Sequence, residues 1–241
     1  MQGTLRTPQQ IAYEHLRDGI LTGRYVARSR LKSEIVAQEL GISRMPVREA
    51  LRQLHAEGLV TVRPNRGAIV TSLTADDVME LFEMRAVLEA LATHHAAQKA
   101  TAEDYQRLTD QLRDLRKHKT DSLTWSALHD QFHDSICRLS GRERLCNQVA
   151  LIRQQVLPHT RFYAGSASDP EIAGYEHDAI LSAMQHDGPD AAAAVMRAHI
   201  MQNAASIVEA LAELQADGAP DTAAAPDLAE PTQPLRRAKA G

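Results

Sequence analysis

Cysteine, aromatic side chains and long apolar runs are all scarce in this chain of 241 residues. Two cysteines, Cys137 and Cys146, are too few for the disulfide framework of small secreted domains. No apolar run approaches the roughly 18 residues that a membrane helix needs, and residues 1–8 lack the apolar stretch of a signal peptide. We therefore expect a cytoplasmic protein with reduced thiols. Because only 4% of the residues are aromatic, its core must be mostly aliphatic.

Charge is divided unevenly along the chain. The formal net charge is −4, but residues 1–73 hold eleven Lys or Arg and six Asp or Glu, a net of +5. The remaining residues hold 16 basic and 25 acidic side chains, a net of −9. A basic head on an acidic body predicts that only the head meets a polyanion such as DNA.

The hydrophobic periodicity predicts a mainly α-helical chain with one short β-rich stretch. Helical spacing covers residues 8–22, 33–40 and 43–57, and the β-rich runs 59–62 and 68–71 flank a turn-rich connection, which predicts a hairpin. From Thr74 onward every segment is helical, with about six helices expected at 74–99, 102–118, 121–140, 142–164, 171–187 and 189–216. Residues 217–241 hold four prolines and few large apolar residues, which predicts a disordered tail.

The helix expected at 43–57 has two different faces. An apolar stripe at i, i+3, i+4, i+7 spacing is formed by Val47, Ala50, Leu51 and Leu54. Arg44, Arg48 and Arg52 recur every four residues on the opposite side. A short helix, a tight turn at Gly41-Ile42 and an arginine-striped helix are typical of a helix-turn-helix, whose second helix enters the major groove of DNA. The hairpin that follows would be the wing, and residues 1–73 would form a winged helix-turn-helix domain. The alternative is that the arginines form an ordinary solvated face.

A specific motif lies in this region. It comprises Ser43-Arg44-Met45-Pro46-Val47-Arg48-Glu49-Ala50-Leu51, Leu54, Glu57-Gly58-Leu59-Val60 and Arg66-Gly67. The motif resembles the GntR family of bacterial regulators, and the resemblance covers roughly residues 8–72. It implies a transcriptional regulator, a repressor in our interpretation, that binds palindromic operators as a homodimer. We expect DNA contacts from Ser43, Arg44, Pro46, Arg48 and Arg52 on the helix and from Asn65, Arg66 and Gly67 on the wing.

The helical body, residues 74–216, resembles the FCD domain of the FadR-like branch of that family. The resemblance depends on Glu83-Met84-Arg85-Ala86-Val87-Leu88-Glu89, Phe132-His133, Glu176-His177-Asp178-Ala179-Ile180 and Met196-Arg197-Ala198-His199. In many members an Asp or Asn and three histidines bind a divalent metal, which helps to hold a small carboxylate effector. The resemblance therefore implies a metal-binding, effector-binding and dimerisation domain.

Four histidines stand at the positions implied for the metal: His129, His133, His177 and His199. His129 and His133 are four residues apart, so both imidazoles project from one helical face. His129 departs from the family pattern, which has Asp or Asn there. A set of four imidazoles favours Zn, Ni or Cu over Mn or Mg, and we expect Zn. Cys137, one turn after His133, lies either near the metal or in the core. Each histidine alone would more often be a structural or surface residue.

Two polar residues are candidates for effector binding. Arg85 lies on the otherwise inward-facing stripe Val78, Phe82, Arg85, Glu89 and Ala92, where a guanidinium needs an anion, either Glu89 or a ligand carboxylate. Asn203 follows His199 by four residues and would line the same cavity.

Two other functions would also combine a DNA-binding head with a helical body. A helical metallohydrolase with a DNA-binding head would need a general base beside the histidines, and the sequence shows no evident one, nor a GxSxG elbow, a P-loop or a dinucleotide fingerprint. We therefore expect no enzyme. A purely architectural DNA-binding protein would have no need for polar side chains on inward helical faces.

Overall fold

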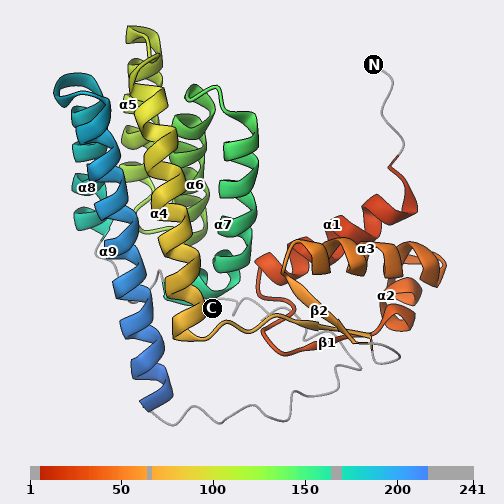
Figure 1. Ribbon diagram of the computed structural model, residues 1–241. Helices are drawn as coiled ribbons and strands as arrows, with labels where there is room; N and C mark the ends of the chain where they lie inside the picture. The colour runs from red at the N-terminus through yellow and green to blue at the C-terminus, as the bar shows by residue number, and fades with distance from the viewer. Residues whose placement is uncertain (1–5, 64–66, 164–169, 217–241) are drawn as a thin grey trace, which may run out of the picture. The chain divides into compact units, whose positions relative to one another are not determined.

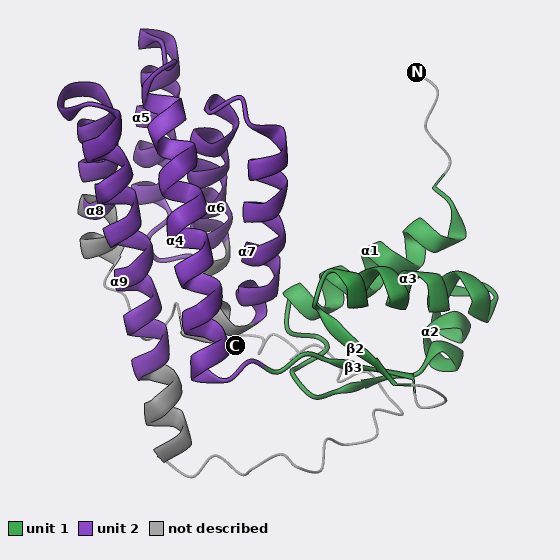
Figure 2. Cartoon of the chain, viewed as in Figure 1, with its two compact units in different colours: residues 1–72, 220–241 green, residues 73–219 purple. Residues whose placement is uncertain are grey.

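The computed structural model describes residues 6–63, 67–163 and 170–216. These residues form two compact units, and the chain passes from one to the other between Ser72 and Leu73 (Figures 1 and 2). The first unit is a small helical head with a three-stranded sheet, and the second is all helical. This confirms the expected fold class. The expected disordered tail, 217–241, lies outside the described residues, as do Asn65 and Arg66 at the expected wing tip.

The head contains three helices and three strands. In chain order they are α1 (Pro8–Leu21), β1 (Arg30–Leu31), α2 (Ser33–Leu40), α3 (Arg44–Ala56), β2 (Val60–Arg63) and β3 (Gly67–Val70). Thr7 caps α1 through a reciprocal capping box with Gln10. The apolar stripe of α3 is buried together with Leu16 and Ile20 of α1, so the predicted apolar face of α3 is confirmed.

The sheet has the order β1-β3-β2, and both pairings are antiparallel. The sequence predicted β2 and β3 within one residue of their ends but missed β1. In the register, Arg30 lies opposite Ile69, and Val60 lies opposite Val70. The two residues of β1 are too few to show the alternating pattern of a strand in the sequence. They form a strand because they pair with the free edge of β3.

Two glycines are required by backbone geometry. Gly41 ends α2 in the left-handed region at φ +65° and so sets the turn into α3. Gly67 begins β3 at φ +80°, and a Cβ added there would lie 2.7 Å from the carbonyl oxygen of Leu31. Gly67 is one of the expected DNA contacts of the wing. In the structure, glycine is required at position 67 because β1 passes close beside the start of β3.

The second unit is a bundle of long helices. They are α4 (Ala75–Ala97), α5 (Ala102–Lys117), α6 (Ser122–Leu139), α7 (Glu143–Tyr163), α8 (Pro170–Ser182), the π-turn η1 (Ala183–Asp187) and α9 (Pro189–Ala216). Thr74 and Asp77 form a capping box at the start of α4. In Figure 1, α4 and α9 run side by side, and α4 also contacts α6 and α7. The core is mostly aliphatic, as expected for a chain poor in aromatic residues: Leu108, Leu112 and Ile200 are among the aliphatic side chains that pack with two phenylalanines, Phe82 and Phe132.

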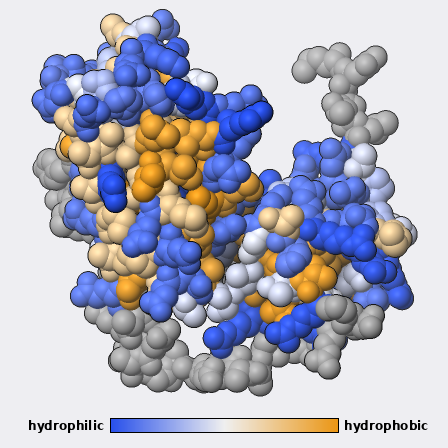
Figure 3. Space-filling model, in the orientation of Figure 1, coloured by the Kyte–Doolittle hydropathy of each residue, from blue (hydrophilic) through white to orange (hydrophobic). Residues whose placement is uncertain are grey.

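One face of α4 remains apolar and exposed. Met84, Val87 and Leu91 are 42%, 52% and 47% exposed, at positions that share one side of the helix. Figure 3 shows apolar residues gathered on the face of the helical unit turned to the viewer. Among the described residues, no helix combines the length and the apolar character needed to cross a membrane.

Candidate metal centre and DNA-binding surface

Helix α3 presents a cationic surface. Ser43, at its N-cap, makes no capping hydrogen bond through its side chain and is exposed, whereas Pro46 is half-buried. Arg44 and Arg52 are also exposed, and each is paired with a neighbouring glutamate, Arg44 with Glu34 at 3.3 Å and Arg52 with Glu49 at 2.6 Å. Such exposed pairs contribute little to stability.

Arg48 differs from the other two arginines of this surface. Its side chain is exposed, and it makes no hydrogen bond or ion pair with any residue that the structure describes. Because Val47 and Leu51 on either side of it are buried in the head core, Arg48 is held on a fixed helical scaffold and points away from it. A guanidinium in this position is suited to donate two hydrogen bonds to a guanine edge.

The structure brings the four predicted histidines together inside the helical unit. His129 and His133 come from α6, His177 from α8 and His199 from α9, and one ring nitrogen from each lies within 4.8 Å of the others. Around a tetrahedral metal at about 2.1 Å, ligand nitrogens are roughly 3.4 Å apart. Small side-chain rotations would therefore convert this cluster into a ligand set. Asp130 is outside it, with a carboxylate oxygen 3.8 Å from Nδ1 of His129.

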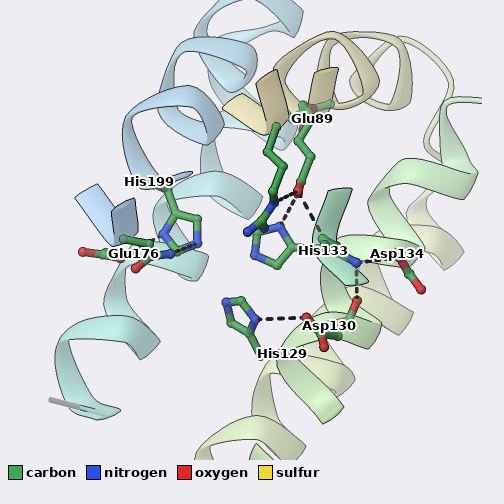
Figure 4. Close-up of polar contacts among 11 residues, drawn as sticks. Glu89, His129, Asp130, His133, Asp134, Glu176 and His199 are labelled. Atoms are coloured by element: carbon green, nitrogen blue, oxygen red, sulfur yellow. Dashed lines mark hydrogen bonds and ion pairs between the residues drawn. The ribbon is translucent and has the colours of Figure 1, made fainter. Parts of the chain in front are cut away.

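Two carboxylates orient two of these rings (Figure 4). Nδ1 of His133 donates to Glu89 at 2.8 Å, and Nδ1 of His199 donates to Glu176 at 2.9 Å. A histidine that donates from Nδ1 keeps a lone pair on Nε2, which is how metal-ligating histidines are usually held. Nε2 of His133 is buried and has no hydrogen-bond partner among the described residues. Such an orphaned acceptor fits an ion better than it fits an apolar core.

Burial keeps the two histidines of α6 neutral. The pKa of His133 lies well below its usual value because burial penalises the charged ring, although Glu89 opposes the shift. The pKa of His129 is lowered for the same reason, with Asp130 opposing. The indole of Trp125 stacks on the ring of His129 at a centroid distance of 5.0 Å. Neutral imidazole is the form that binds metals, so both rings are in the correct state at pH 7.

Glu89 is the centre of a buried ion network. Its carboxylate accepts a hydrogen bond from Nε of Arg85 at 3.0 Å and lies 3.4 Å from Nε of Arg153 on α7. Burial alone would raise the pKa of Glu89, but Arg153, Arg85 and His133 hold it well below its usual value. The sequence left two possible anionic partners for Arg85, Glu89 or a ligand carboxylate. In the structure the partner of Arg85 is Glu89.

Arg153 was not singled out from the sequence. It lies on an inward stripe of α7 between Val149, Ile152 and Val156, all buried, so the reasoning applied to Arg85 would have found it. Nη1 of Arg153 donates to Asp134 at 2.6 Å, but its buried Nε and Nη2 make no hydrogen bond to described residues. Two guanidinium groups thus share one fully buried carboxylate beside the histidines.

Asn203 lies at the histidine cluster, whereas Cys137 lies in the apolar core. The amide nitrogen of Asn203 lies 3.2 Å from Nε2 of His199, so Asn203 is at the cluster. Cys137 is instead buried with Ala92 and Val149, which is the core position that the sequence left open.

Comparison with known proteins agrees with this architecture. Residues 8–70 match the model of "Bacterial regulatory proteins, gntR family", and residues 80–202 match the FCD domain. The regulator YdhC of Bacillus subtilis is 32% identical over 56% of this chain and 62% of its own length. The Nta operon transcriptional regulator of Aminobacter aminovorans is 30% identical over 75% of this chain and 85% of its own.

A solved structure shows the same fold. It is that of Escherichia coli McbR/YncC, which is 19% identical and is matched over 86% of this chain and 99% of its own length with a TM-score of 0.72. With its winged head, its helical FCD domain and relatives named as transcriptional regulators rather than enzymes, the chain belongs to the GntR family of bacterial regulators.

Proposed function

We propose that this regulator binds operator DNA through residues 1–73 and senses a small carboxylate-bearing metabolite beside a divalent metal in residues 74–216. The observation that carries the sensing proposal is the cluster of four histidine nitrogens within 4.8 Å of one another. An architectural body would have no use for four convergent imidazoles, because each would need its own hydrogen-bonding arrangement in an apolar interior.

Operator reading is assigned to α3 and the wing. Arg48 supplies the central base contact in this proposal, and Arg44 and Arg52 exchange their exposed glutamate partners for DNA. In this proposal the sugar-phosphate backbone of the DNA is contacted by Ser43 and Pro46 at the start of α3. The wing contacts it through Asn65, Arg66 and Gly67. The net charge of +5 in the head supports this assignment, because phosphate neutralisation provides most of the affinity.

The metal site is assigned to His129, His133, His177 and His199, with zinc as the preferred ion. Four neutral nitrogen ligands suit Zn²⁺ and its neighbours Ni²⁺ and Cu²⁺, whereas Mg²⁺ and Mn²⁺ favour oxygen. A bound metal would supply a positive charge and an electrophilic centre for a carboxylate. Glu89 and Glu176 hold the rings of His133 and His199 in the tautomer that presents Nε2.

The effector is assigned to the side of the cluster next to the buried arginines. Arg85 and Arg153 both pair with the carboxylate of Glu89. Nε and Nη2 of Arg153 are buried and make no hydrogen bond with any residue that the structure describes. A carboxylate ligand on this side would give these donors an acceptor, while Nη1 of Arg153 keeps its pair with Asp134. Asn203, whose amide contacts the free nitrogen of His199, would turn to the ligand once that nitrogen is occupied.

We further propose a homodimer that is formed by the helical unit and acts as a repressor. Palindromic operators require two copies of the head about one helical turn apart, or a multiple of it. The exposed apolar face of α4, at Met84, Val87 and Leu91, is suited to a second copy of itself. Leu91→Glu should shift sedimentation toward the monomer, and Lys117→Glu, an exposed change on α5, should not. A wild-type monomer at micromolar concentration would refute the dimer.

The experiment that tests the sensing proposal is a thermal-shift screen of organic and sugar acids, with and without Zn²⁺. A ligand at 100 times its dissociation constant should add about 2.7 kcal/mol to the stability of the folded state. The hits are then tested for their effect on binding to an operator selected from random duplex DNA. Stabilisation by an acid only in the presence of metal supports the proposal. If metal neither binds nor changes the response to any acid, the proposal fails.

A further inference from the structure

Two cysteines meet at the turn between α6 and α7. Cys137 lies in the last turns of α6 and Cys146 in the first turns of α7, and Sγ of Cys146 donates to the carbonyl oxygen of Cys137 at 3.0 Å. Both belong to one small apolar cluster with Ala92 and Val149. Cys137 is 3% exposed, whereas Cys146 is only half-buried. The Cys146 thiol therefore contacts the backbone of Cys137, and the two side chains also interact, but they differ in access to solvent.

A pocket of about 480 Å³ reaches both residues. Its wall also carries Arg138 and Arg142, together with Asp134 and Glu143. None of the four clustered histidines lines it, so it is distinct from the candidate metal centre. A small polar molecule that enters this pocket meets the sulfur of Cys146 before that of the more deeply buried Cys137.

We propose that Cys137 and Cys146 form a reversible intramolecular disulfide when a small hydroperoxide enters this pocket. The sulfur of Cys146 attacks one peroxide oxygen, the O–O bond breaks, and the other oxygen leaves as water or an alcohol after taking up the proton of the thiol. The Cys146 sulfur is then a sulfenic acid. The sulfur of Cys137 attacks it, the S–S bond forms, and the S–OH oxygen leaves as water with the Cys137 proton. Two thiols are oxidised by two electrons, and one hydroperoxide is reduced.

The environment of Cys137 fits the role of the second, resolving thiol. Burial raises the pKa of its thiol, and the contact with Cys146 raises it further, so it stays protonated and unreactive toward oxidants in solution. Oxidation of Cys146 would place a reactive sulfur beside the Cys137 side chain, with which that of Cys146 already interacts. The resulting disulfide would join the helix that carries His133 to the helix that carries Arg153. The inference is independent of the proposed metal and effector, because it uses neither.

The test uses the full-length reduced protein, exposed to hydrogen peroxide and then analysed by thiol titration and intact mass. We expect the loss of both titratable thiols, a mass lower by two hydrogen atoms, a Cys137–Cys146 linked peptide, and full reversal by a dithiol reductant. Retention of both thiols would overturn the proposal, and so would a disulfide between two chains on a non-reducing gel.

Two variants separate the steps. Cys137→Ala should leave a sulfenic acid at Cys146 that reacts with dimedone, and Cys146→Ala should leave Cys137 unmodified under the same exposure. Equal modification of Cys137 in the Cys146→Ala variant would show that the pocket does not direct the order and would overturn the assignment. Arg197→Ala, an exposed change on α9, serves as a control that should oxidise like the wild type.

Discussion

Replacement of Glu89 by glutamine isolates the buried ion network from the rest of the site. Glutamine keeps the size of the side chain and one oxygen but removes the charge that Arg85 and Arg153 share. The side chains of Arg85, Glu89 and Arg153 are 8%, 3% and 9% exposed, so water cannot replace the lost carboxylate. We expect two consequences, one for stability and one for metal binding.

The stability cost follows from the charges left behind. Removal of one partner from a buried ion pair costs about 3–5 kcal/mol, because an uncompensated charge stays buried. For a helical unit of this size, 1 kcal/mol shifts the melting temperature by roughly 2–4 °C. Glu89→Gln should therefore lower the melting temperature of the metal-free helical unit by about 6–20 °C. Metal affinity should also fall, by about 10–100-fold, since His133 loses the carboxylate that orients it.

Glu176→Gln is the matched control. Glu176 holds His199 through a bond of 2.9 Å, much like the 2.8 Å bond of Glu89, but it is 20% exposed and pairs with no buried arginine among the described residues. It should lower metal affinity by a similar factor of about 10–100. The melting temperature of the metal-free protein should change little, by less than the equivalent of about 1 kcal/mol.

Differential scanning calorimetry of chelator-treated protein measures the first effect, and competition with a zinc-binding dye measures the second. The reasoning requires the two variants to resemble each other in metal affinity and to differ in stability. Equal melting temperatures for Glu89→Gln and Glu176→Gln would refute the account of the buried network, and unchanged metal affinity in both would refute the role of the carboxylates.

Three further results are expected. Arg48→Ala should weaken specific operator binding by about 1–3 kcal/mol, roughly 5–150-fold in fluorescence anisotropy at fixed salt, because base contacts are lost; wild-type affinity in this variant would exclude the docking of α3. Gly67→Ala should lower the melting temperature of the head, measured by circular dichroism, because alanine at φ +80° is strained and its Cβ meets Leu31; an unchanged transition would contradict the close packing of β1 on β3. The metal-free helical unit should lose stability as the pH falls below about 6.5. Histidines of the unfolded chain then take up protons, whereas His133 in the folded state does not, because burial lowers its pKa. A melting temperature that stays constant between pH 7 and pH 5 would contradict a neutral buried His133.

The head could be predicted closely from the sequence because its signals are local. The apolar stripe of α3 from Val47 to Leu54 has an unbroken helical period, and Gly41 marks the turn before it. The strand β1 could not be predicted, since Arg30 and Leu31 become a strand only through pairing with β3. Its formation is a tertiary effect with no local pattern.

The candidate site was predictable in part. His129 and His133 share a helical face by spacing alone, whereas His177 and His199 were singled out through the resemblance to the FCD domain. Their convergence depends on how α6, α8 and α9 pack, which no local spacing encodes. The same holds for Glu176, whose bond to His199 joins two helices.

The buried network of Arg85, Glu89 and Arg153 could be predicted from the sequence only in part. Arg85 was found because a charge interrupts an apolar stripe, and Arg153 interrupts a similar stripe on α7. The sequence analysis identified the need for an anion only at Arg85, and it did not show that Arg85 and Arg153 both pair with Glu89. The contact between Cys137 and Cys146 was likewise beyond the sequence, because it arises from the turn that brings the ends of α6 and α7 together.

The most direct test of the central claim is X-ray absorption spectroscopy of the full-length protein loaded with zinc, combined with elemental analysis. The account predicts about one zinc per chain, bound by nitrogen ligands at about 2.0–2.1 Å with the imidazole scattering of several histidines. His133→Ala and His177→Ala should each lose most of the metal, and His118→Ala, which changes an exposed histidine after α5, should keep it. Zinc bound in equal amounts by the His133→Ala variant, or a shell made mainly of oxygen or sulfur, would contradict a metal centre built from these four histidines.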